Sequence, residues 1–378
     1  MKIAYVAHIR FPSERAHAVQ IVHMANAFAS LGHDVALYVS TRKTAIAESP
    51  EAYYGVPFRF MLKWVSIPDI VGSIHRFPKI LHPYLYILER IFFSISFILT
   101  MWNKSYDLIY CRDDLVLWCV ALFFPRQKVV WESHEGKHNF FSKRLLSQGL
   151  TVVISEGIKE RYVSLGHNPE LIFVAHDAVD DSFFSAPADR AQVRMRLGIA
   201  SEKPVVLYIG GLDAWKGVYT LFDAAVLLPH VHMAVIGGAD SKIASLRIEY
   251  PSVQFLGSRP YRELPENQQA ADILVIPNTA KDVLSSSYTS PLKLFAHMTS
   301  RVPLIVSDIP SLRAVLDEAS ALFFEPDNPR SLAEGISQVL HNPEEAHTRA
   351  LHAYELSKRY TWKERARVIL LAEQERSL

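Results

Sequence analysis

Residues 2–7 read KIAYVA, a helical pattern follows as far as Gly32, and residues 35–39 read VALYV. Short β-branched runs and longer helical patterns continue to alternate in this way, which is typical of a parallel sheet with helices on both faces. Gly32 stands where a glycine is expected just after a helix. The opening stretch is therefore predicted to be the first buried strand of an α/β domain.

A second series of the same alternation begins near residue 204. An acidic, proline-containing stretch and one charged helical segment interrupt the pattern between residues 180 and 200, and PVVLYIG at residues 204–210 restarts it. A chain of 378 residues has room for two domains of ordinary size. We predict an α/β fold of two Rossmann-like, doubly wound parallel-sheet domains facing a central cleft. The ligand is expected in that cleft, because open α/β sheets bind ligands at the carboxyl ends of their strands. The predicted parts are an N-terminal domain at residues 1–180, a C-terminal domain at residues 181–360 and a terminal helix at residues 361–378 that crosses back to the N-terminal domain.

The charge balance and the cysteine count exclude several classes of protein. Lys and Arg together number 40 against 39 Asp and Glu, a formal net charge of +1, which gives no electrostatic basis for nucleic-acid binding. Two cysteines, Cys111 and Cys119, cannot form a disulfide framework and are too few for a zinc site, so a reduced, cytoplasmic setting is expected. Because no His and Cys residues have metal-ligand spacing, we expect neither a metal nor a cofactor.

One stretch resembles a membrane segment, IFFSISFILTMW at residues 91–102, but it is shorter than the ~20 residues that span a bilayer. The first interpretation is a helix buried between a sheet and its neighbours. The second is a helix whose exposed part lies on a membrane surface, where nearby basic residues would favour contact. These basic residues are Arg76, Lys79, Arg90 and Lys104. The second interpretation predicts that replacing Phe92, Phe93 and Phe97 by Ser removes binding to anionic vesicles. The N-terminus is not expected to be a signal peptide, because its apolar run is short.

The sequence GGLDAWKG at residues 210–217 directly follows a predicted strand. Gly210 and Gly211 permit close approach of the backbone to a ligand, and Lys216 lies at the entrance of the next helix, where amides and helix dipole already favour an anion. The functional interpretation is a clamp for a diphosphate. The alternative is an ordinary strand-to-helix turn with a solvated lysine.

A serine-rich segment, SSSYTSPLK at residues 285–293, follows another predicted strand. Pro291 suits the first turn of a helix, and the Ser and Thr residues before it leave amides and hydroxyls for an anion. Lys293 places a positive charge where the helix dipole disfavours it, which indicates a ligand anion. The alternative is a simple serine-rich helix cap.

Three further segments stand at predicted strand ends in the N-terminal half. His134, in WESHEG at residues 131–136, is a candidate polar group of the cleft, which Glu132 and Glu135 would orient or assist as acid and base. The alternative is a structural histidine. The loop RFPSER at residues 10–15 and Arg112 are positioned for substrate contact, or are merely solvated.

Taken together, these residues resemble the family-4 retaining glycosyltransferases, enzymes of the glycosyltransferase group 1 type with the GT-B architecture. The resemblance covers nearly the whole chain. Its main segments are residues 10–35, ISEGIKERYVSLG at 154–166, GGLDAWKG at 210–217, YTSPLKLFAHMTSRVPLIVSDIPSLRAVL at 288–316 and FFEPDNPRSLAEGI at 323–336.

The resemblance implies a transferase whose second domain binds a nucleotide-activated sugar and whose first domain binds the acceptor. It implies His134 and Lys216 as catalytic residues, with Lys216 on the donor diphosphate and His134 on the donor sugar. The implied donor-binding residues are Gly210, Gly211, Lys216, Gly238, Ser258, Arg259, Tyr288, Thr289, Ser290, Pro291, Leu292 and Lys293. The implied acceptor-binding residues are Arg10, Ser13, Arg15 and Arg112. The family's retention of configuration implies front-face transfer without an enzymic nucleophile and without a metal.

The chain departs from the family pattern at several positions. Tyr288 and Ala296 stand where the family commonly has two glutamates, of which the second binds the donor ribose, and Gly211 stands where an arginine is often found. A lost charged hydrogen bond costs ~1.5–3 kcal/mol, and Lys293 or His297 would have to compensate. A non-catalytic GT-B scaffold subunit is therefore the alternative function, and another two-domain enzyme, such as a nucleotide-sugar epimerase, is a third.

The expected task, which rests on the family analogy, is the addition of one sugar to a lipid-linked or polysaccharide acceptor in bacterial surface-glycan assembly, such as lipopolysaccharide or capsule. The expected location is the cytoplasm, with peripheral contact to the inner face of the cytoplasmic membrane as the alternative for the apolar segment.

Overall fold

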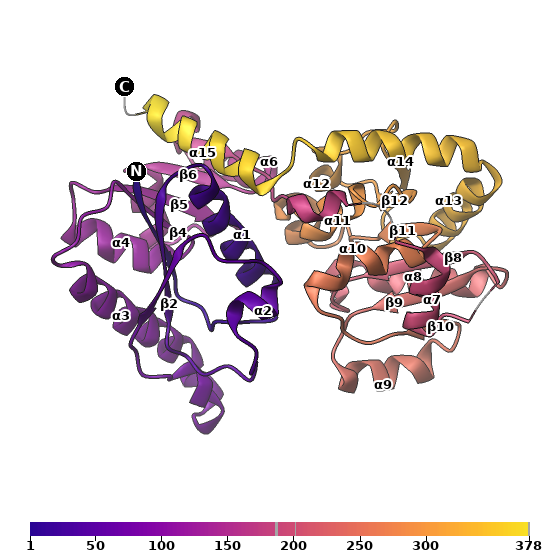
Figure 1. The fold of residues 1–378 in the computed structure, drawn as a ribbon, viewed down its shortest axis with the longest axis horizontal. Coiled ribbons are helices and arrows are strands. Elements are labelled where there is room, and N and C mark those ends of the chain that lie inside the picture. The colour runs from indigo at the N-terminus through magenta and orange to yellow at the C-terminus, as the bar shows by residue number, and fades with distance from the viewer. Residues whose placement is uncertain (186–187, 201, 377–378) are drawn as a thin grey trace. The chain divides into compact units, whose positions relative to one another are not determined.

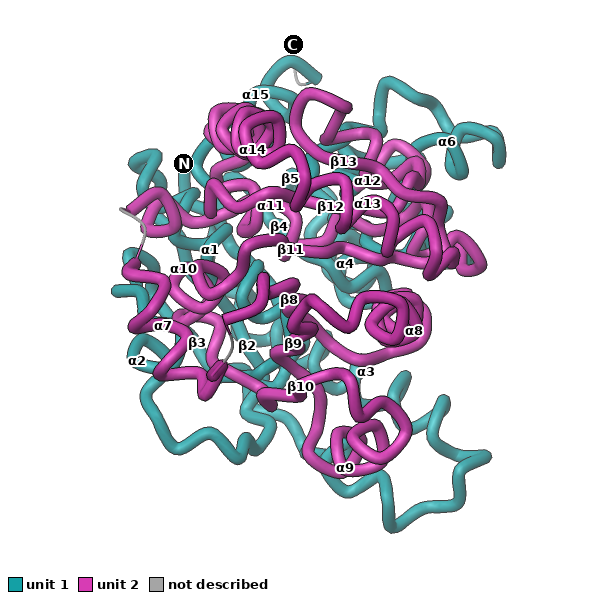
Figure 2. The backbone as a smooth tube through the Cα atoms, turned by 90° about the vertical axis from the view of Figure 1, so that its right-hand side faces the viewer, with its two compact units in different colours: residues 1–154, 158–176, 362–378 teal, residues 155–157, 177–361 magenta. Residues whose placement is uncertain are grey.

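The computed structural model describes residues 1–185, 188–200 and 202–376. The chain divides into two compact units (Figure 2). Unit 1 comprises Met1–Ile154, Ile158–His176 and Trp362–Leu378, and unit 2 comprises Ser155–Gly157 and Asp177–Thr361. The predicted limits at residues 180 and 360 therefore stand beside unit limits at residues 176 and 361.

Unit 1 is built on a seven-stranded parallel sheet with the order β3-β2-β1-β4-β5-β6-β7 (Figure 1). Its strands are β1 (Lys2–Ala7), β2 (Asp34–Ser40), β3 (Met61–Val65), β4 (Leu108–Cys111), β5 (Lys128–Ser133), β6 (Leu150–Val153) and β7 (Ile172–Val174). Its helices are α1 (Ala16–Ser30), α2 (Pro50–Tyr54), α3 (His82–Met101), α4 (Asp114–Phe123), α5 (Phe140–Leu146), most of α6 (Glu156–Ser164) and α15 (Trp362–Arg376), with short turns η1 (Val71–Arg76), η2 (Lys79–Leu81) and η3 (Pro169–Leu171).

Unit 2 is built on a six-stranded parallel sheet with the order β10-β9-β8-β11-β12-β13. Its strands are β8 (Val205–Ile209), β9 (His232–Ile236), β10 (Val253–Phe255), β11 (Ile273–Ile276), β12 (Leu304–Ser307) and β13 (Leu322–Phe324). Its helices are α7 (Arg190–Leu197), α8 (Val218–Leu227), α9 (Asp240–Glu249), α10 (Leu264–Asn267), α11 (Leu292–Met298), α12 (Pro310–Arg313), α13 (Pro329–His341) and α14 (Pro343–Ser357), with short turns η4 (Asp181–Phe184), η5 (Ala214–Lys216), η6 (Tyr261–Glu263), η7 (Gln268–Ala270) and the π-helical turn η8 (Leu284–Tyr288).

The predicted fold class, two Rossmann-like parallel-sheet domains, is confirmed. In each sheet the strand order changes direction once, at β1/β4 in unit 1 and at β8/β11 in unit 2. Open α/β sheets bind ligands outside the carboxyl ends of the strands at such a switch point. The loops that follow β1, β4, β8 and β11 are therefore the places where this fold exposes functional side chains.

The last helix, α15, belongs to unit 1, where it packs against α1. Trp362 at its start is buried and stacks on the ring of His23 of α1, with ring centroids 6.0 Å apart. Unit 1 is thus assembled from segments on both sides of unit 2 in the sequence.

Helix α3 extends further toward the N-terminus than the apolar stretch at residues 91–102 indicated. The segment Lys79–Met101 is long and apolar enough to cross a membrane by length and composition, although core helices of water-soluble proteins meet the same criterion. Only 33% of its apolar window is buried. Phe93 and Phe97 face the core and are inaccessible to solvent, whereas Phe92 is 40% exposed. Replacing all three phenylalanines would therefore damage the core, so a loss of vesicle binding in that variant would not by itself show membrane contact.

Candidate functional site

A pocket of about 270 Å³ lies in unit 1 at the carboxyl ends of β1, β4 and β5, the place that the strand order favours. Its lining residues are Ala7, His8, Ile9, His17, Ile21, Arg90, Arg112, Asp113, Asp114, Trp131, Glu132, Ser133, His134, Glu135 and Lys137. Two predicted site residues, His134 and Arg112, are among them. Arg10, Ser13 and Arg15 are not.

The carboxylate of Glu132, at the end of β5, is fully buried beneath this pocket. It accepts hydrogen bonds from His134 Nε2 at 2.5 Å and from Arg365 Nη2 of α15 at 3.1 Å. Gln20 Nε2 and the Tyr110 hydroxyl also donate to it. Burial alone would raise the pKa of Glu132, but the charge of Arg365 and the contacts from His134 hold it well below its usual value. Glu132 is therefore an ionised group that fixes its neighbours.

His134 is the side chain that Glu132 most directly orients. Burial, followed by the nearby charge of Arg112, lowers the pKa of His134 to about 4, although Glu132 opposes the shift. The imidazole is therefore neutral near pH 7. Because Nε2 donates its proton to the Glu132 carboxylate, Nδ1 is left as a hydrogen-bond acceptor. His17 behaves alike, since burial and Arg112 lower its pKa to about 4.

Arg112, directly after β4, is connected to the same group through Gln20. Its Nη1 donates to Gln20 Oε1 and to the His17 carbonyl oxygen at 3.4 Å, and its own carbonyl oxygen accepts from Trp131 Nε1 at 3.3 Å. Among the residues that the structure describes, Arg112 has no carboxylate within ion-pair distance. This guanidinium is thus a pocket cation that remains available to an anionic or hydroxyl-rich ligand.

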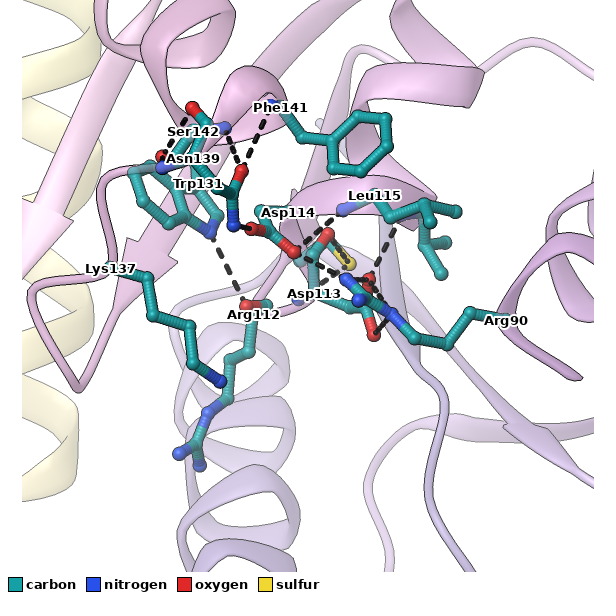
Figure 3. A network of polar contacts seen from close by, with 12 residues as sticks. Arg90, Arg112, Asp113, Asp114, Leu115, Trp131, Lys137, Asn139, Phe141 and Ser142 are labelled. Carbon is teal, nitrogen blue, oxygen red and sulfur yellow. Dashed lines mark hydrogen bonds and ion pairs between the residues drawn. The ribbon is translucent and has the colours of Figure 1, made fainter. Parts of the chain in front are cut away.

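A second polar network borders the pocket on the side of α4 (Figure 3). Arg90 of α3 bonds both carboxylates of Asp113 and Asp114, and Asn139 Nδ2 donates to Asp114 Oδ2 at 2.6 Å. The Arg112 side chain extends away from this network in the same view. Arg90 therefore does not serve as a free basic flank of the apolar helix, as the membrane interpretation had it.

The predicted acceptor loop at residues 10–15 is engaged in contacts of its own. Arg10 forms an ion pair with Glu14 at 2.7 Å, and Arg15 is the exposed residue that precedes α1. Ser13 is buried, and its amide donates to the Tyr54 hydroxyl at 2.9 Å. Of the four predicted acceptor residues, the structure brings only Arg112 together with His134.

In unit 2 the residues of the predicted clamp lie in the loop at the carboxyl end of β8. Gly210 and Gly217 adopt left-handed φ values of 157° and 66°, which favour glycine, and η5 between them places Lys216. Lys216 Nζ lies over Gly211, so close that a Cβ atom on that glycine would be only 2.7 Å from the Lys216 nitrogen. The ammonium group is 3.6 Å from Asp213 Oδ2, an exposed carboxylate. Lys216 thus lies directly beside the two glycines.

Lys293 joins this group from α11. Its Nζ is 3.4 Å from the Tyr208 hydroxyl and 4.4 Å from the centroid of the Tyr208 ring, while the same hydroxyl donates to the Gly211 carbonyl oxygen at 2.7 Å. Burial, followed by repulsion from Lys216, holds the pKa of Lys293 well below its usual value. Across the described residues, no carboxylate forms an ion pair with Lys293. Two lysines therefore converge beside Gly210 and Gly211.

The other predicted donor residues of unit 2 lie on neighbouring loops. Gly238 accepts from Ser258 Oγ at 2.9 Å, and Arg259 Nη1 donates to the Ser258 carbonyl oxygen at 3.1 Å. Tyr288 ends η8, Thr289 is extended, and Pro291 precedes Leu292 at the start of α11. Ser290 Oγ accepts from the Asp177 amide at 2.8 Å.

Ala296 occupies the position of the glutamate that commonly binds the donor ribose. Ala296 is fully buried in the core of unit 2, and so is His297, whose Nδ1 lies 3.2 Å from Gln268 Oε1. Burial lowers the pKa of His297 to about 3, so the ring is neutral. His297 is thus a neutral, fully buried ring beside Gln268, and the compensation of the lost glutamate by Lys293 or His297 stays a prediction.

Sequence reasoning missed several residues of both groups. Tyr208, Gln20 and Arg365 carry no motif, and although each lies on a predicted strand or helix, no local pattern indicates that its side chain contacts the site. In the part of the chain that the structure describes, no three His, Cys, Asp or Glu side chains are grouped so that they could hold a metal ion.

The comparisons with known proteins can now be set beside this geometry. Residues 189–355 match the model of glycosyl transferases group 1. The resemblance to this glycosyltransferase group is confirmed for these residues. The match contains every predicted donor residue, from Gly210 to Lys293. The family-4 subtype stays a prediction.

The sequence of this chain aligns with about half of the length of each curated relative. The chain is 26% identical over 218 residues to a D-inositol 3-phosphate glycosyltransferase of Corynebacterium urealyticum, covering 53% of this chain and 50% of the relative. It is 24% identical over 208 residues to the putative teichuronic acid biosynthesis glycosyltransferase TuaC of Bacillus subtilis, covering 55% and 51%. The chain thus spans about half the length of the curated relatives it matches.

Solved structures share the fold over the whole chain. Anabaena HepE in complex with UDP and glucose superposes with a TM-score of 0.73 at 19% identity, covering 100% of both chains. The sucrose-phosphate synthase of Thermosynechococcus elongatus gives a TM-score of 0.76 at 18% identity, covering 100% of this chain and 99% of that one. These neighbours have the GT-B fold, and the predicted GT-B architecture is confirmed.

Proposed function

We propose that this protein is a retaining glycosyltransferase that moves a sugar from a nucleotide-sugar donor to a lipid-linked or polysaccharide acceptor in bacterial surface-glycan assembly. The observation that carries the proposal is the convergence of Lys216 and Lys293 beside Gly210 and Gly211, within the region that matches the family model. The printed names of similar proteins, among them TuaC and a HepE complex with UDP and glucose, support the substrate class.

In this proposal, unit 2 binds the donor. The diphosphate accepts hydrogen bonds from Lys216 and Lys293 and from the backbone amides of Thr289, Ser290 and Leu292, because Pro291 has no N–H to donate. Negative charge on the diphosphate grows as the glycosidic bond breaks, so cations already in place stabilise the transition state more than the ground state. Gly238, Ser258 and Arg259 contact the nucleoside.

Unit 1 binds the sugar and the acceptor. His134 is held by Glu132 with Nδ1 as an acceptor, which suits a contact with a sugar hydroxyl, and Arg112 contacts the acceptor. The mechanism needs no enzymic nucleophile, since the leaving diphosphate takes the acceptor proton on the face that it leaves. The chain uses its cations to stabilise that leaving group, and we propose no metal in the reaction.

Peripheral contact with the inner face of the cytoplasmic membrane is the second part of the proposal. Exposed apolar residues of α3 and its C-cap recur every three or four positions, which places them on one helical face. They are Tyr84, Leu88, Ile91, Ile95, Leu99 and Trp102. Exposed Arg76, Lys79 and Lys104 flank this face and would attract anionic lipid.

A panel of nucleotide sugars tests the proposal. We expect one of them to raise the melting temperature and to be consumed when a glycan acceptor is added. Lys216→Ala should abolish transfer while circular dichroism stays unchanged. Lys358→Ala, which removes an exposed lysine paired with Glu355 elsewhere in unit 2, is the matched control and should retain full activity. Normal turnover by Lys216→Ala would refute the proposed role.

A non-catalytic GT-B scaffold is the second candidate, favoured by Tyr288 and Ala296 at the positions where the family commonly has two glutamates. In that case no nucleotide diphosphate or nucleotide sugar would shift the melting temperature at millimolar concentration. Binding of a donor without turnover in the presence of acceptors would also favour it.

A further inference from the structure

Helix α3 carries one acidic and one arginine residue, and they are adjacent. Glu89 and Arg90 interrupt an otherwise apolar sequence in the middle of the helix. Glu89 is fully buried, and the Arg90 side chain is 24% exposed. Both side chains make ion pairs with residues of unit 1 outside α3. A helix with a large exposed apolar face thus directs its charges toward the pocket.

The Arg90 guanidinium makes three hydrogen-bond contacts with the Asp113 carboxylate and one with the Asp114 carboxylate (Figure 3). Its Nε lies 3.0 and 2.9 Å from the two carboxylate oxygens of Asp113, and Nη2 lies 2.6 Å from Asp113 Oδ1. Nη2 also donates to Asp114 Oδ1. Only a planar guanidinium can make this set of contacts, because an ammonium group offers one nitrogen.

The two aspartates connect Arg90 to the loops that carry the proposed substrate-binding residues. Asp113 caps α4 by accepting from the Val116 amide at 3.0 Å, and it directly follows Arg112. Asp114 accepts from Asn139, which forms a capping box at the start of α5 and ends the loop that contains His134. Arg90 therefore fixes the loop after β4 directly, and it acts on the loop after β5 through the bond between Asp114 and Asn139.

Glu89 fixes the position from which Arg90 acts. It accepts from the Val71 amide at 2.6 Å and from His8 Nε2 at 3.2 Å, and it forms an ion pair with Arg42 Nε at 3.3 Å. These contacts reach η1, the end of β1 and the end of β2. The middle of α3 is thus held on several sides, and the guanidinium has a defined origin.

We propose that Arg90 is a positioning residue, which holds Arg112 and His134 at the separation needed for sugar transfer by clamping the two loops together. This inference rests on the proposed function of Arg112 and His134. Arg90 lies among the pocket-lining residues, and its Nε and Nη2 are bonded to Asp113 and Asp114, so we assign its effect on the reaction to these two contacts. Small displacements of oriented groups cost up to about 100-fold in rate.

The test compares Arg90→Lys and Arg90→Ala with the native enzyme in steady-state assays. Arg90→Lys keeps the charge but loses the fork, and we expect kcat to fall about tenfold or more while the KM for the donor changes less than about twofold. Guanidinium ions added to Arg90→Ala should restore part of kcat. Arg367→Ala removes an exposed bidentate pair with Glu364 in the same unit and is the control, with expected native kinetics.

Hydrogen exchange separates this inference from the proposed function. In Arg90→Lys, amides of residues 112–116 and 137–142 should exchange faster whether or not the enzyme turns over. An inactive native protein with this exchange pattern would refute the proposed function but not the clamp. Native kcat and native exchange in Arg90→Lys would overturn the clamp, as would a loss of activity that guanidinium ions do not restore in a folded Arg90→Ala.

Discussion

Arg365 Nη2 of the last helix lies 3.1 Å from the carboxylate of Glu132, although 233 positions separate the two residues in the chain. Both side chains are almost completely buried, at 3% and 0% exposure. Arg365 also donates from Nε to the His176 carbonyl oxygen at 2.8 Å. One arginine thus neutralises the buried charge that orients His134 and joins α15 to the sheet of unit 1.

Replacing Arg365 by leucine should strongly destabilise unit 1. The substitution leaves the Glu132 carboxylate buried without its charged partner, which costs about 3–5 kcal/mol. Urea unfolding followed by tryptophan fluorescence measures the loss. The exposed Arg367→Ala variant on the same helix should stay within about 0.5 kcal/mol of the native protein. A loss of less than 1 kcal/mol in Arg365→Leu would contradict the assignment.

The low pKa of His134 predicts a dependence of stability on pH. The folded protein keeps the ring neutral down to about pH 4, whereas the unfolded chain binds a proton near pH 6.5. Above pH 6.5 the ring is neutral in both states and does not change the free energy of unfolding. As the pH falls from 6.5 toward 4, the unfolded chain binds a proton that the folded protein does not, and the free energy of unfolding decreases by up to about 3 kcal/mol. Urea titrations at several pH values should show a smaller loss in His134→Gln. Carbon-13 NMR of the native imidazole should show no titration between pH 8 and pH 5, and a midpoint near 6.5 would disprove the shift.

Lys293 should make donor binding dependent on pH. Burial and Lys216 favour its neutral amine in the unliganded protein, whereas a bound diphosphate favours the ammonium form. Binding therefore takes up a proton above the lowered pKa, and donor affinity should fall as the pH rises. Calorimetry in buffers of different ionisation enthalpy measures that proton. Lys293→Met should bind about 10- to 100-fold more weakly and lose the proton uptake, while the exposed Lys203→Ala should resemble the native protein.

The exposed face of α3 should determine binding to anionic vesicles. Ile91, Ile95 and Leu99 are 38%, 51% and 67% exposed, so their joint replacement by Ser removes apolar contact with lipid at little cost to the core. We expect sedimentation with vesicles to be lost and the melting temperature to be nearly unchanged. Ile248→Ser, at an apolar position of unit 2 that is 85% exposed, is the control. Undiminished sedimentation of the triple variant would exclude this face as the lipid contact.

Local patterns predicted the strands, the loops that follow them and most of the candidate site. Gly210 and His134 each stand directly after a strand and Lys216 lies in the loop that follows one, where hydrophobic alternation ends, and this boundary is visible in a single sequence. Lys293 was predicted from its unfavourable place at a helix start, and the structure places it beside Tyr208. The positions of these residues at strand and helix ends are confirmed, because each depends on a few neighbouring residues, while their roles stay predictions.

Contacts between distant segments could not be predicted in this way. The partnership of Glu132 with Arg365 depends on a helix that follows unit 2 in the sequence, and no local signal indicates it. The start of α3 was missed because Glu89 and Arg90 interrupt the apolar run, whereas in the fold both are compensated by ion pairs. Arg10, Ser13 and Arg15 were grouped with Arg112 by loop position and by the family resemblance, and none of the three lines the pocket.

The discontinuous make-up of unit 1 has a consequence for biosynthesis. A ribosome releases β1 to β7 long before α15, so the nascent chain must keep an uncovered α1 surface and an uncompensated carboxylate at Glu132 while all of unit 2 is translated. Unit 2 is continuous except for Ser155–Gly157 and is available to fold during that interval. We therefore expect unit 1 to complete its native structure only after all of unit 2 has been translated.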